Sequence, residues 1–434
     1  MISKTNSPDR FLISDYEQTK LKVLDLAKRF STFCFLDNHH YPAKGKGIEC
    51  LLAAGAEQFV TTDAGSSLAA LEKILQQKKW IFGHCSYELK NEWEKNPATL
   101  PDEIGFPSLY FFEPVWQIRL SEDELVVEKG DPQEIFLALQ NDGEETAAAE
   151  NDTAPLQIHS RFSETEYIET IQRLREHIHR GDCYEINFCQ DFYAEKATID
   201  PFKAYRQLSR LSPNPFSALY RQDDHWLICA SPERFLKKSG NHIISQPIKG
   251  TVPRNRQDEL LDEAAREQLH RSAKDRSENV MVVDLVRNDL SRICREGTVQ
   301  VDELFGIYSF PQVYQMISTI SGELNSDTSF TDIMHALFPM GSMTGAPKKS
   351  VMELISKYEK RSRGIFSGAL GYFNPEGDFD FNVVIRSILY NASSGYLSFP
   401  AGSGITWYSD PKQEWEECLV KAAAIRQVLE NKKD

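Results

Sequence analysis

Two short acidic patterns have the residue types and the spacing to hold a divalent cation. Glu414, Glu417 and Lys421 follow one another at i, i+3 and i+7, so on a helix they project from one face. Asp275 and Glu278 repeat the i, i+3 spacing. Two helices that each present such a pair could bind Mg²⁺ while part of its water shell stays in place. Acidic pairs at this spacing are also common on solvated helix faces, so the pattern alone leaves both interpretations open.

Two glycine-rich segments could bring the backbone close to a ligand. The segment 341–350, GSMTGAPKKS, is not a phosphate-binding loop, because three residues separate its glycines and Ala-Pro precedes Lys348. Gly402-Ser403-Gly404 lacks the third glycine of a dinucleotide-binding motif, since Trp407 stands there. Paired glycines after a strand can still offer N–H groups to a carboxylate, although a plain β-turn is the alternative.

The elements that must position these residues follow from hydrophobic spacing. Apolar residues at helical spacing predict helices over 164–180 and 412–431, and the charged stretch 259–294 reads as largely helical. Short apolar or alternating runs predict strands over 80–85, 108–112, 184–193, 225–230, 242–248, 365–373, 381–389 and 396–401. Strands that mostly neighbour each other, with helices grouped between them, indicate an α+β fold with antiparallel sheets.

Composition narrows the classes of function. The 434 residues carry a formal net charge of −15, which argues against nucleic acid or an anionic membrane surface as a partner. With no apolar signal core and no long apolar run, we expect a cytoplasmic protein that does not enter a membrane. The eight cysteines form no CxxC pair, which predicts reduced, mostly buried thiols. Residues 141–156 are mostly acidic, small or polar and predict a flexible excursion between regions 1–140 and 157–434.

Seven short motifs follow one another along the chain: SPERF (231–235), PIKGT (247–251), ENVMVVDLVRNDL (278–290), TGAPK (344–348), FNVVIRS (381–387), AGSGI (401–405) and EWEECLVKA (414–422). Their sequences and their order resemble those of the chorismate-utilising enzymes, the family of anthranilate, aminodeoxychorismate, isochorismate and salicylate synthases. The resemblance runs from Phe162 to the C-terminus and is faint in the region before it. On these motifs the chain is identified as a member of that family.

The resemblance implies a fold and a site. The fold is a single large α+β unit of two stacked antiparallel sheets flanked by helices, with residues 1–140 packed into it. The implied Mg²⁺ ligands are Glu278 and Glu417, with Asp275 and Glu414 holding the metal's waters, and the metal grips the ring carboxylate of chorismate. The implied substrate-binding residues are Arg386, Gly402, Gly404, Lys421, Thr251 and Ser342.

Lys249, in PIKGT, points to one branch of the family. Other branches typically have alanine there, whereas lysine resembles the aminodeoxychorismate synthases. In the implied mechanism Mg²⁺ polarises the ring carboxylate while the lysine amine attacks carbon 2; the hydroxyl on carbon 4 leaves, ammonia adds there, and the lysine is expelled. This requires a neutral amine, so we expect burial or cationic neighbours to lower the pKa of Lys249 from roughly 10.4. A solvated lysine on a turn is the alternative.

Four further residues bear on the branch. Glu233, in SPERF, resembles the general acid that protonates the departing hydroxyl. This role requires a carboxylic acid whose pKa is raised by burial. A helix cap or an ion pair with Arg234 is the alternative. Glu185 stands where the water-adding branches have a lysine base, which disfavours those reactions. Gln315 replaces a histidine that anthranilate synthases use in losing pyruvate. Phe366 replaces a substrate-contacting tyrosine of many relatives, which leaves that contact open.

The sequence thus predicts that chorismate and ammonia are converted to 4-amino-4-deoxychorismate for 4-aminobenzoate and folate synthesis. Because the chain has no recognisable glutaminase motif, we expect a separate glutamine amidotransferase subunit to supply the ammonia. One alternative is an anthranilate synthase component I, which Lys249 contradicts. The other is a catalytically weak chorismate-binding subunit, which the intact Glu233, Lys249, Glu278 and Glu417 argue against. Whether the N-terminal region holds tryptophan, as in some relatives, is left open by the sequence.

Overall fold

The computed structural model describes residues 2–4, 7–41, 49–62, 66–94, 100–140, 156–310 and 312–430. All of the predicted excursion except Leu156 lies outside these residues, so the excursion and the boundaries drawn on it remain predictions. No helix in the described ranges is both long and apolar enough to cross a membrane. All eight cysteines are unpaired and buried, as predicted.

The strands form one antiparallel ladder with two arms that meet at β6 (Leu109–Leu120). The first arm runs through β4 (Cys50–Thr62), β3 (Thr32–Asp37), β10 (Phe216–Gln222), β11 (His225–Ser231), β20 (Ser387–Asn391), β21 (Tyr396–Ile405) and β9 (Glu185–Ala194), with β8 (His159–Ser160) and β17 (Gly345–Ala346) on β9. The second runs through β5 (Ile81–Cys85), β18 (Ala369–Phe373), β19 (Phe379–Asn382), β12 (Arg234–Ser239), β13 (His242–Gln246) and β16 (Val313–Glu323), with β14 (Ile248–Pro253) and β15 (Gln300–Ser309) on β16. The strands β7 (Glu124–Lys129), β2 (Arg10–Ile13) and β1 (Ile2–Lys4) extend the ladder from β6.

The two arms stack face to face around one apolar core. Alternate residues of a strand point to opposite faces, and on β10 Tyr220 enters the core between the arms while Leu219 enters a second core on the outer face. On β19 of the second arm, Asp380 and Asn382 face the first arm, where they line a cavity together with Leu36 and Phe216, whereas Phe381 points to the opposite face and contacts Phe330. The prediction of an α+β fold with two stacked antiparallel sheets is therefore confirmed, with the addition that β6 joins the sheets.

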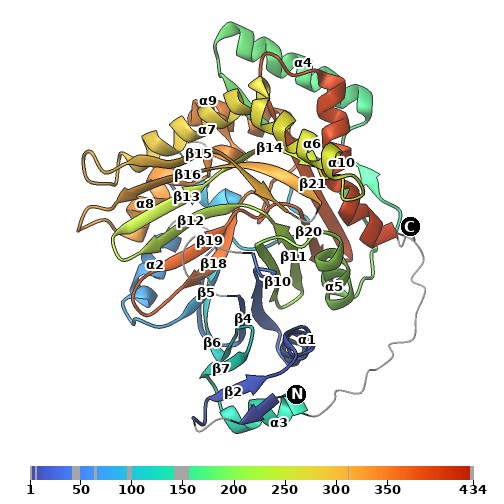
Figure 1. Ribbon diagram of the computed structural model, residues 1–434. Helices are drawn as coiled ribbons and strands as arrows, with labels where there is room; N and C mark the ends of the chain where they lie inside the picture. Colours follow the sequence, from blue (N-terminus) through green and yellow to red (C-terminus); the bar gives the residue numbers. More distant parts are fainter. Residues whose placement is uncertain are drawn as a thin grey trace.

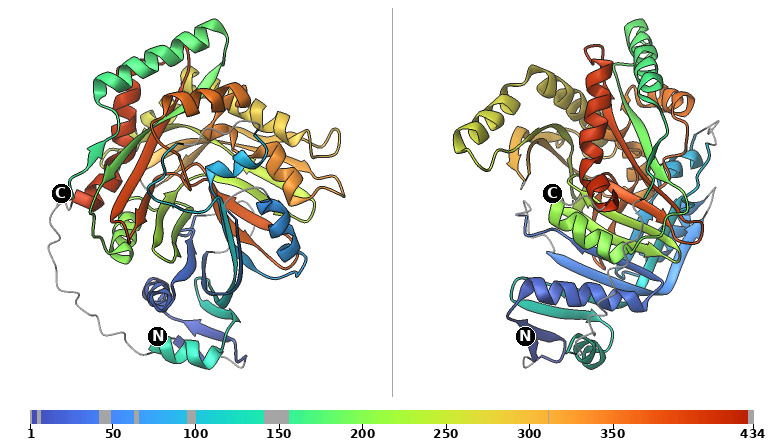
Figure 2. Two further views of the ribbon diagram at one scale, coloured as in Figure 1. Left: turned by 180° about the vertical axis from the view of Figure 1, so that it is seen from behind. Right: turned by 90° about the vertical axis from the view of Figure 1, so that its right-hand side faces the viewer.

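Helices cover the outer faces of the arms (Figure 1). They are α1 (Tyr16–Leu26), α2 (Ser67–Leu75), α3 (Pro132–Gln140), α4 (Glu164–Arg180), α5 (Pro201–Leu211), α6 (Glu259–Arg271), α7 (Ala273–Leu290), α8 (Phe330–Leu337), α9 (Lys348–Tyr358) and α10 (Pro411–Glu430), with short 3-10 turns at Ala27–Arg29, Tyr87–Glu92 and Gly341–Met343. Phe202 of α5 and Ile425 of α10 pack on the first arm, and Leu269 of α6 packs on the second. Figure 2 shows α1 and α3 at the end of the molecule opposite α4.

Capping residues determine where the predicted helices begin and end. Ser163 and Glu166 make a capping box at the start of α4, and Gly181 ends it with φ of 84°. The predicted 412–431 helix is α10. The helical stretch 259–294 is two helices, because Ser272 leaves the helical conformation and caps α7 through its hydroxyl.

One predicted strand is wrong as a continuous element. Residues 381–389 divide into β19, which ends at Asn382, and β20, which begins at Ser387. Between them Arg386 adopts a φ of 53°, the left-handed conformation that a strand does not contain. The apolar spacing was unbroken across this point, so hydrophobic periodicity did not reveal the break.

Candidate active site

The predicted site residues meet in one cavity of about 570 Å³. It is lined by Glu233, Lys249, Thr251, Asp275, Glu278, Ser342, Arg386, Gly402, Gly404, Glu417 and Lys421. Strands β14 and β21 supply the lysine and the two glycines, and helices α7 and α10 supply the acidic pairs. Of the predicted set only Glu414 does not line the cavity, although it lies 1% exposed behind it.

Lys249 is buried and held by a carboxylate from the other arm of the ladder. Its side chain is 9% exposed, and its Nζ lies 2.6 Å from Oε1 of Glu185 on β9. The alternative of a solvated lysine on a turn is therefore wrong, because Lys249 lies in a strand, with its amine in the interior.

The charge expected on Lys249 needs a correction. Burial lowers the pKa of Lys249, but the carboxylates of Glu185, Glu278 and Glu233 outweigh burial and raise the pKa above its ordinary value. The sequence predicted cationic neighbours or unopposed burial, whereas the nearest groups are anionic. The amine is thus protonated in the site as the structure has it, and it must lose a proton before it can attack a carbon atom.

The paired glycines are part of strand β21 and not of a turn. Gly402 and Gly404 pair with Cys189 and Asn187 on β9. A β-carbon on Gly402 would lie 2.4 Å from the Phe188 carbonyl oxygen. A β-carbon on Gly404 would lie 2.7 Å from both the Lys249 amine and Oε1 of Glu185. The missing side chain of Gly404 therefore makes room for the lysine and its carboxylate.

Glu278 of α7 and Glu417 of α10 face the cavity, and Glu414 lies buried behind them. Lys274 Nζ lies 3.5 Å from Oε1 of Glu414 and 3.9 Å from Oε1 of Glu278, so it links α10 to α7. Oε1 of Glu278 and Oε2 of Glu414 are buried without a hydrogen-bond partner. Burial raises the pKa of Glu278 to about 7. Burial also raises the pKa of Glu417, but Lys421, with Nζ 2.6 Å away, outweighs this and lowers it.

These carboxylates fit a magnesium ion that keeps much of its water. Among the described residues no three His, Cys, Asp or Glu side chains cluster tightly enough to hold a metal by themselves. Mg²⁺ is commonly held by one or two protein carboxylates, with waters and substrate oxygens completing its shell. Oε1 of Glu278, which is buried without a hydrogen-bond partner, is an oxygen of the kind that such a cation would satisfy.

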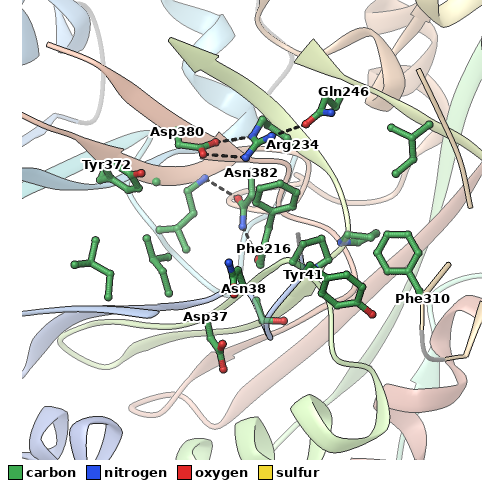
Figure 3. A pocket seen from close by; sticks show the side chains of 18 of the residues that line it. Asp37, Asn38, Tyr41, Phe216, Arg234, Gln246, Phe310, Tyr372, Asp380 and Asn382 are labelled. Carbon is green, nitrogen blue, oxygen red and sulfur yellow. Dashed lines mark hydrogen bonds and ion pairs between the residues drawn. The ribbon is translucent and has the colours of Figure 1, made fainter. Parts of the chain in front are cut away.

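Glu233 is almost fully buried at the cavity wall, at 4% exposed. Burial raises the pKa of Glu233 to about 7, even though Ser342 and Lys249 act in the opposite direction. The alternative ion pair with Arg234 is absent. Figure 3 shows the Arg234 guanidinium turned to Asp380 and Gln246 in a second cavity of about 140 Å³, with Nε 2.8 Å from Oδ1 of Asp380.

Two cationic side chains reach the same cavity. Arg386 projects from the left-handed residue between β19 and β20, and no described side chain makes an ion pair or hydrogen bond with it. Burial lowers the pKa of its guanidinium. Lys421 donates to the Gly402 carbonyl oxygen at 2.8 Å and pairs with Glu417. The cavity therefore offers a free guanidinium beside an anchored ammonium, which suits a ligand with carboxylates.

The two departures noted in the sequence also line the cavity. Phe366 is 2% exposed and forms an apolar part of the wall. Gln315 lies opposite Thr251 in the β14–β16 pairing, and its Oε1 is buried without a hydrogen-bond partner. Ser342 lies within the turn 341–343, beside Glu233.

Sequence reasoning missed three residues of the site. Glu185 was weighed only as a replacement for a lysine base, Asn187 was not singled out, and Lys274 was passed over beside its acidic neighbours. Glu185 and Asn187 alternate on β9, a strand buried on both faces. Polar residues in such a strand are uncommon, and this is the signal that could have identified them.

Comparison with known proteins agrees with this geometry. The sequence profile described as "chorismate binding enzyme" matches residues 36–427. Aminodeoxychorismate synthase component 1 of Escherichia coli (strain K12) is 36% identical over 406 residues, which cover 88% of this chain and 86% of that protein. The protein of the same name from Salmonella typhimurium is 35% identical over 352 residues, covering 80% and 76%. The crystal structure of anthranilate synthase component I from Streptococcus pneumoniae TIGR4 shows the same fold, with a TM-score of 0.74 at 23% identity. The match covers 89% of this chain and 95% of that one.

Since the family profile spans most of the chain and includes every residue of the cavity, the chain belongs to the chorismate binding enzyme family.

Proposed function

We propose that this chain aminates chorismate at carbon 4, giving 4-amino-4-deoxychorismate in an Mg²⁺-dependent reaction. The relatives in Escherichia coli and Salmonella typhimurium are named aminodeoxychorismate synthase component 1, which supports this product. The observation that carries the proposal is Lys249: a buried amine opens on the cavity between a protonatable Glu233 and the two acidic helices.

Glu278 and Glu417 would hold the magnesium ion, with Asp275 and Glu414 placed toward its waters. When bound, the metal would polarise the ring carboxylate and draw electron density from the ring. Arg386, Lys421 and the backbone N–H groups near Gly402 and Gly404 would bind the carboxylates of chorismate. In a protein of net charge −15, this local set of cations is what makes an anionic substrate acceptable.

The side chains then act in a defined order. The neutral Lys249 amine forms a bond to ring carbon 2, the double bonds shift, and the bond from carbon 4 to its hydroxyl breaks. Glu233 donates the proton with which that hydroxyl leaves as water, a role for which a pKa near 7 is suited. Ammonia next bonds to carbon 4, the double bonds shift back, and the bond to Lys249 breaks. The enolpyruvyl group is kept.

A separate glutamine amidotransferase subunit would supply the ammonia, which fits the designation "component 1" of the relatives. We place the reaction in the cytoplasm, where unpaired buried thiols are stable. The product would lead to 4-aminobenzoate and folate.

The test incubates the purified chain with chorismate, Mg²⁺ and an ammonium salt at alkaline pH, and identifies the product by mass spectrometry and fluorescence. We expect 4-amino-4-deoxychorismate without release of pyruvate. Fluorescent anthranilate with stoichiometric pyruvate would instead assign the chain to the anthranilate synthase reaction. No turnover with either assay would favour a subunit that only binds chorismate.

A further inference from the structure

The carboxylate of Glu185 is the one hydrogen-bonded partner of the Lys249 amine among the described residues. Oε1 accepts from Nζ at 2.6 Å, and Oε2 is buried without a partner. Glu185 is 1% exposed, so water has little access to this contact. Because β9 and β14 belong to different arms, the pair also spans the interior between the arms.

Other carboxylates face Lys249, but each has a different position. Glu278 on α7, Glu417 on α10 and Glu233 after β11 all act on Lys249 electrostatically. None of them lies within 4 Å of the amine as an ion pair, and Glu417 is held by Lys421 at 2.6 Å. Glu233 must keep its own proton for the leaving hydroxyl. Only Glu185 has the contact needed to take a proton directly.

We infer that Glu185 is the proton acceptor that frees the Lys249 amine for attack and keeps that proton while the lysine is bonded to the ring. This inference rests on the proposed function. Before attack, one N–H bond of the Lys249 ammonium breaks and an O–H bond forms on Glu185, which leaves a neutral amine beside a neutral acid. In a site with little water this exchange removes two buried charges, whose desolvation is costly.

The proton returns when the cycle closes. Ammonia forms its bond to carbon 4 as the bond between carbon 2 and the Lys249 nitrogen breaks, so the lysine leaves as a neutral amine. It then takes the proton back from Glu185, which restores the ion pair. Glu185 gains and loses one proton per turnover, and the proton consumed in forming water still comes from Glu233.

The rival role for Glu185 is to balance the lysine charge without moving a proton. The two roles predict opposite results for Glu185→Gln. If Glu185 only stabilises the Lys249 ammonium electrostatically, its loss makes that ammonium less stable, and the amine becomes neutral more easily. If Glu185 is the acceptor, its loss removes the group that takes the proton from the amine, and the attack on the ring slows.

The test measures chorismate amination and the rate of Lys249 adduct formation, by intact mass without ammonia, from pH 6.5 to 9.5 for wild type, Glu185→Gln, Glu185→Asp and Lys249→Ala. Glu113→Gln is the matched control. Glu113 is also a buried strand carboxylate paired with a lysine, Lys79 Nζ at 2.8 Å, but that lysine, unlike Lys249, does not line the cavity.

For Glu185→Gln we expect kcat and the adduct rate to fall by about 10²-fold near pH 7, as for loss of a proton-transfer group. The loss of rate should become smaller as pH rises, because solvent then takes the proton, and the KM for chorismate should stay unchanged. Glu185→Asp should recover part of the rate. Glu113→Gln should keep the pH profile of the wild type. Equal or faster adduct formation in Glu185→Gln near pH 7, or a change in KM alone, would overturn the inference. Full turnover in Lys249→Ala with no wild-type adduct would instead overturn the covalent route of the proposed function.

Discussion

A β-carbon on Gly404 would come within 2.7 Å of the Lys249 Nζ, and this contact makes the glycine part of the active site. We expect Gly404→Ala to displace the lysine and lower kcat by about 10²-fold, since misplacement by ~1 Å has such an effect. The clash is with side-chain ends, so the protein should still fold. Gly402→Ala meets a backbone oxygen at 2.4 Å and should instead lower the thermal midpoint. Equal effects of the two variants on kcat and on the midpoint would contradict this distinction.

Lys249→Ala should abolish the covalent route. With chorismate and Mg²⁺ but no ammonia, the wild type is expected to gain the mass of chorismate less water on Lys249, and the variant to gain nothing. Turnover with ammonia should fall by about 10³-fold or more, as for loss of an activated nucleophile. Peptide mapping of the adduct is the decisive measurement, and an adduct on a different residue would refute the assignment of Lys249.

Glu233 sets the alkaline limit of the pH profile. Burial raises the pKa of Glu233 to about 7, so the acid carries its proton below that pH and loses it above. We expect kcat/KM, measured at constant free ammonia, to decline as pH rises through about 7, and this limb to vanish in Glu233→Gln, which should be slower by about 10²–10⁴-fold. A limb that persists in Glu233→Gln would assign it to another group.

The acidic helices should bind Mg²⁺ without substrate. For the wild type, added Mg²⁺ should raise the thermal midpoint, because a ligand that binds only the folded state stabilises it. Glu278→Gln and Glu417→Gln should each remove this shift and raise the Mg²⁺ concentration required for half-maximal activity. Glu353→Gln on α9, outside the cavity lining, is the control and should keep both. A full Mg²⁺ shift in Glu278→Gln would place the metal elsewhere.

Much of the fold could be predicted from local patterns. The 164–180 helix was predicted from its apolar spacing and matches α4, whose start is fixed locally by the capping box of Ser163 and Glu166. The division of 381–389 was missed because a single left-handed residue, Arg386, breaks the strand without breaking the apolar spacing. That break directs the guanidinium into the cavity.

By itself the sequence determined the residue types of the site and their local geometry. The i, i+3 acidic pairs, the order of the motifs and the presence of Lys249 all depend on neighbours along the chain. The tertiary structure alone decided the charge of that lysine, because Glu185 reaches it from a position 64 residues away in another arm of the ladder. Electrostatic interactions depend on distance in space and on burial, and spacing along the chain specifies neither of these for residues that meet only when the sheets stack.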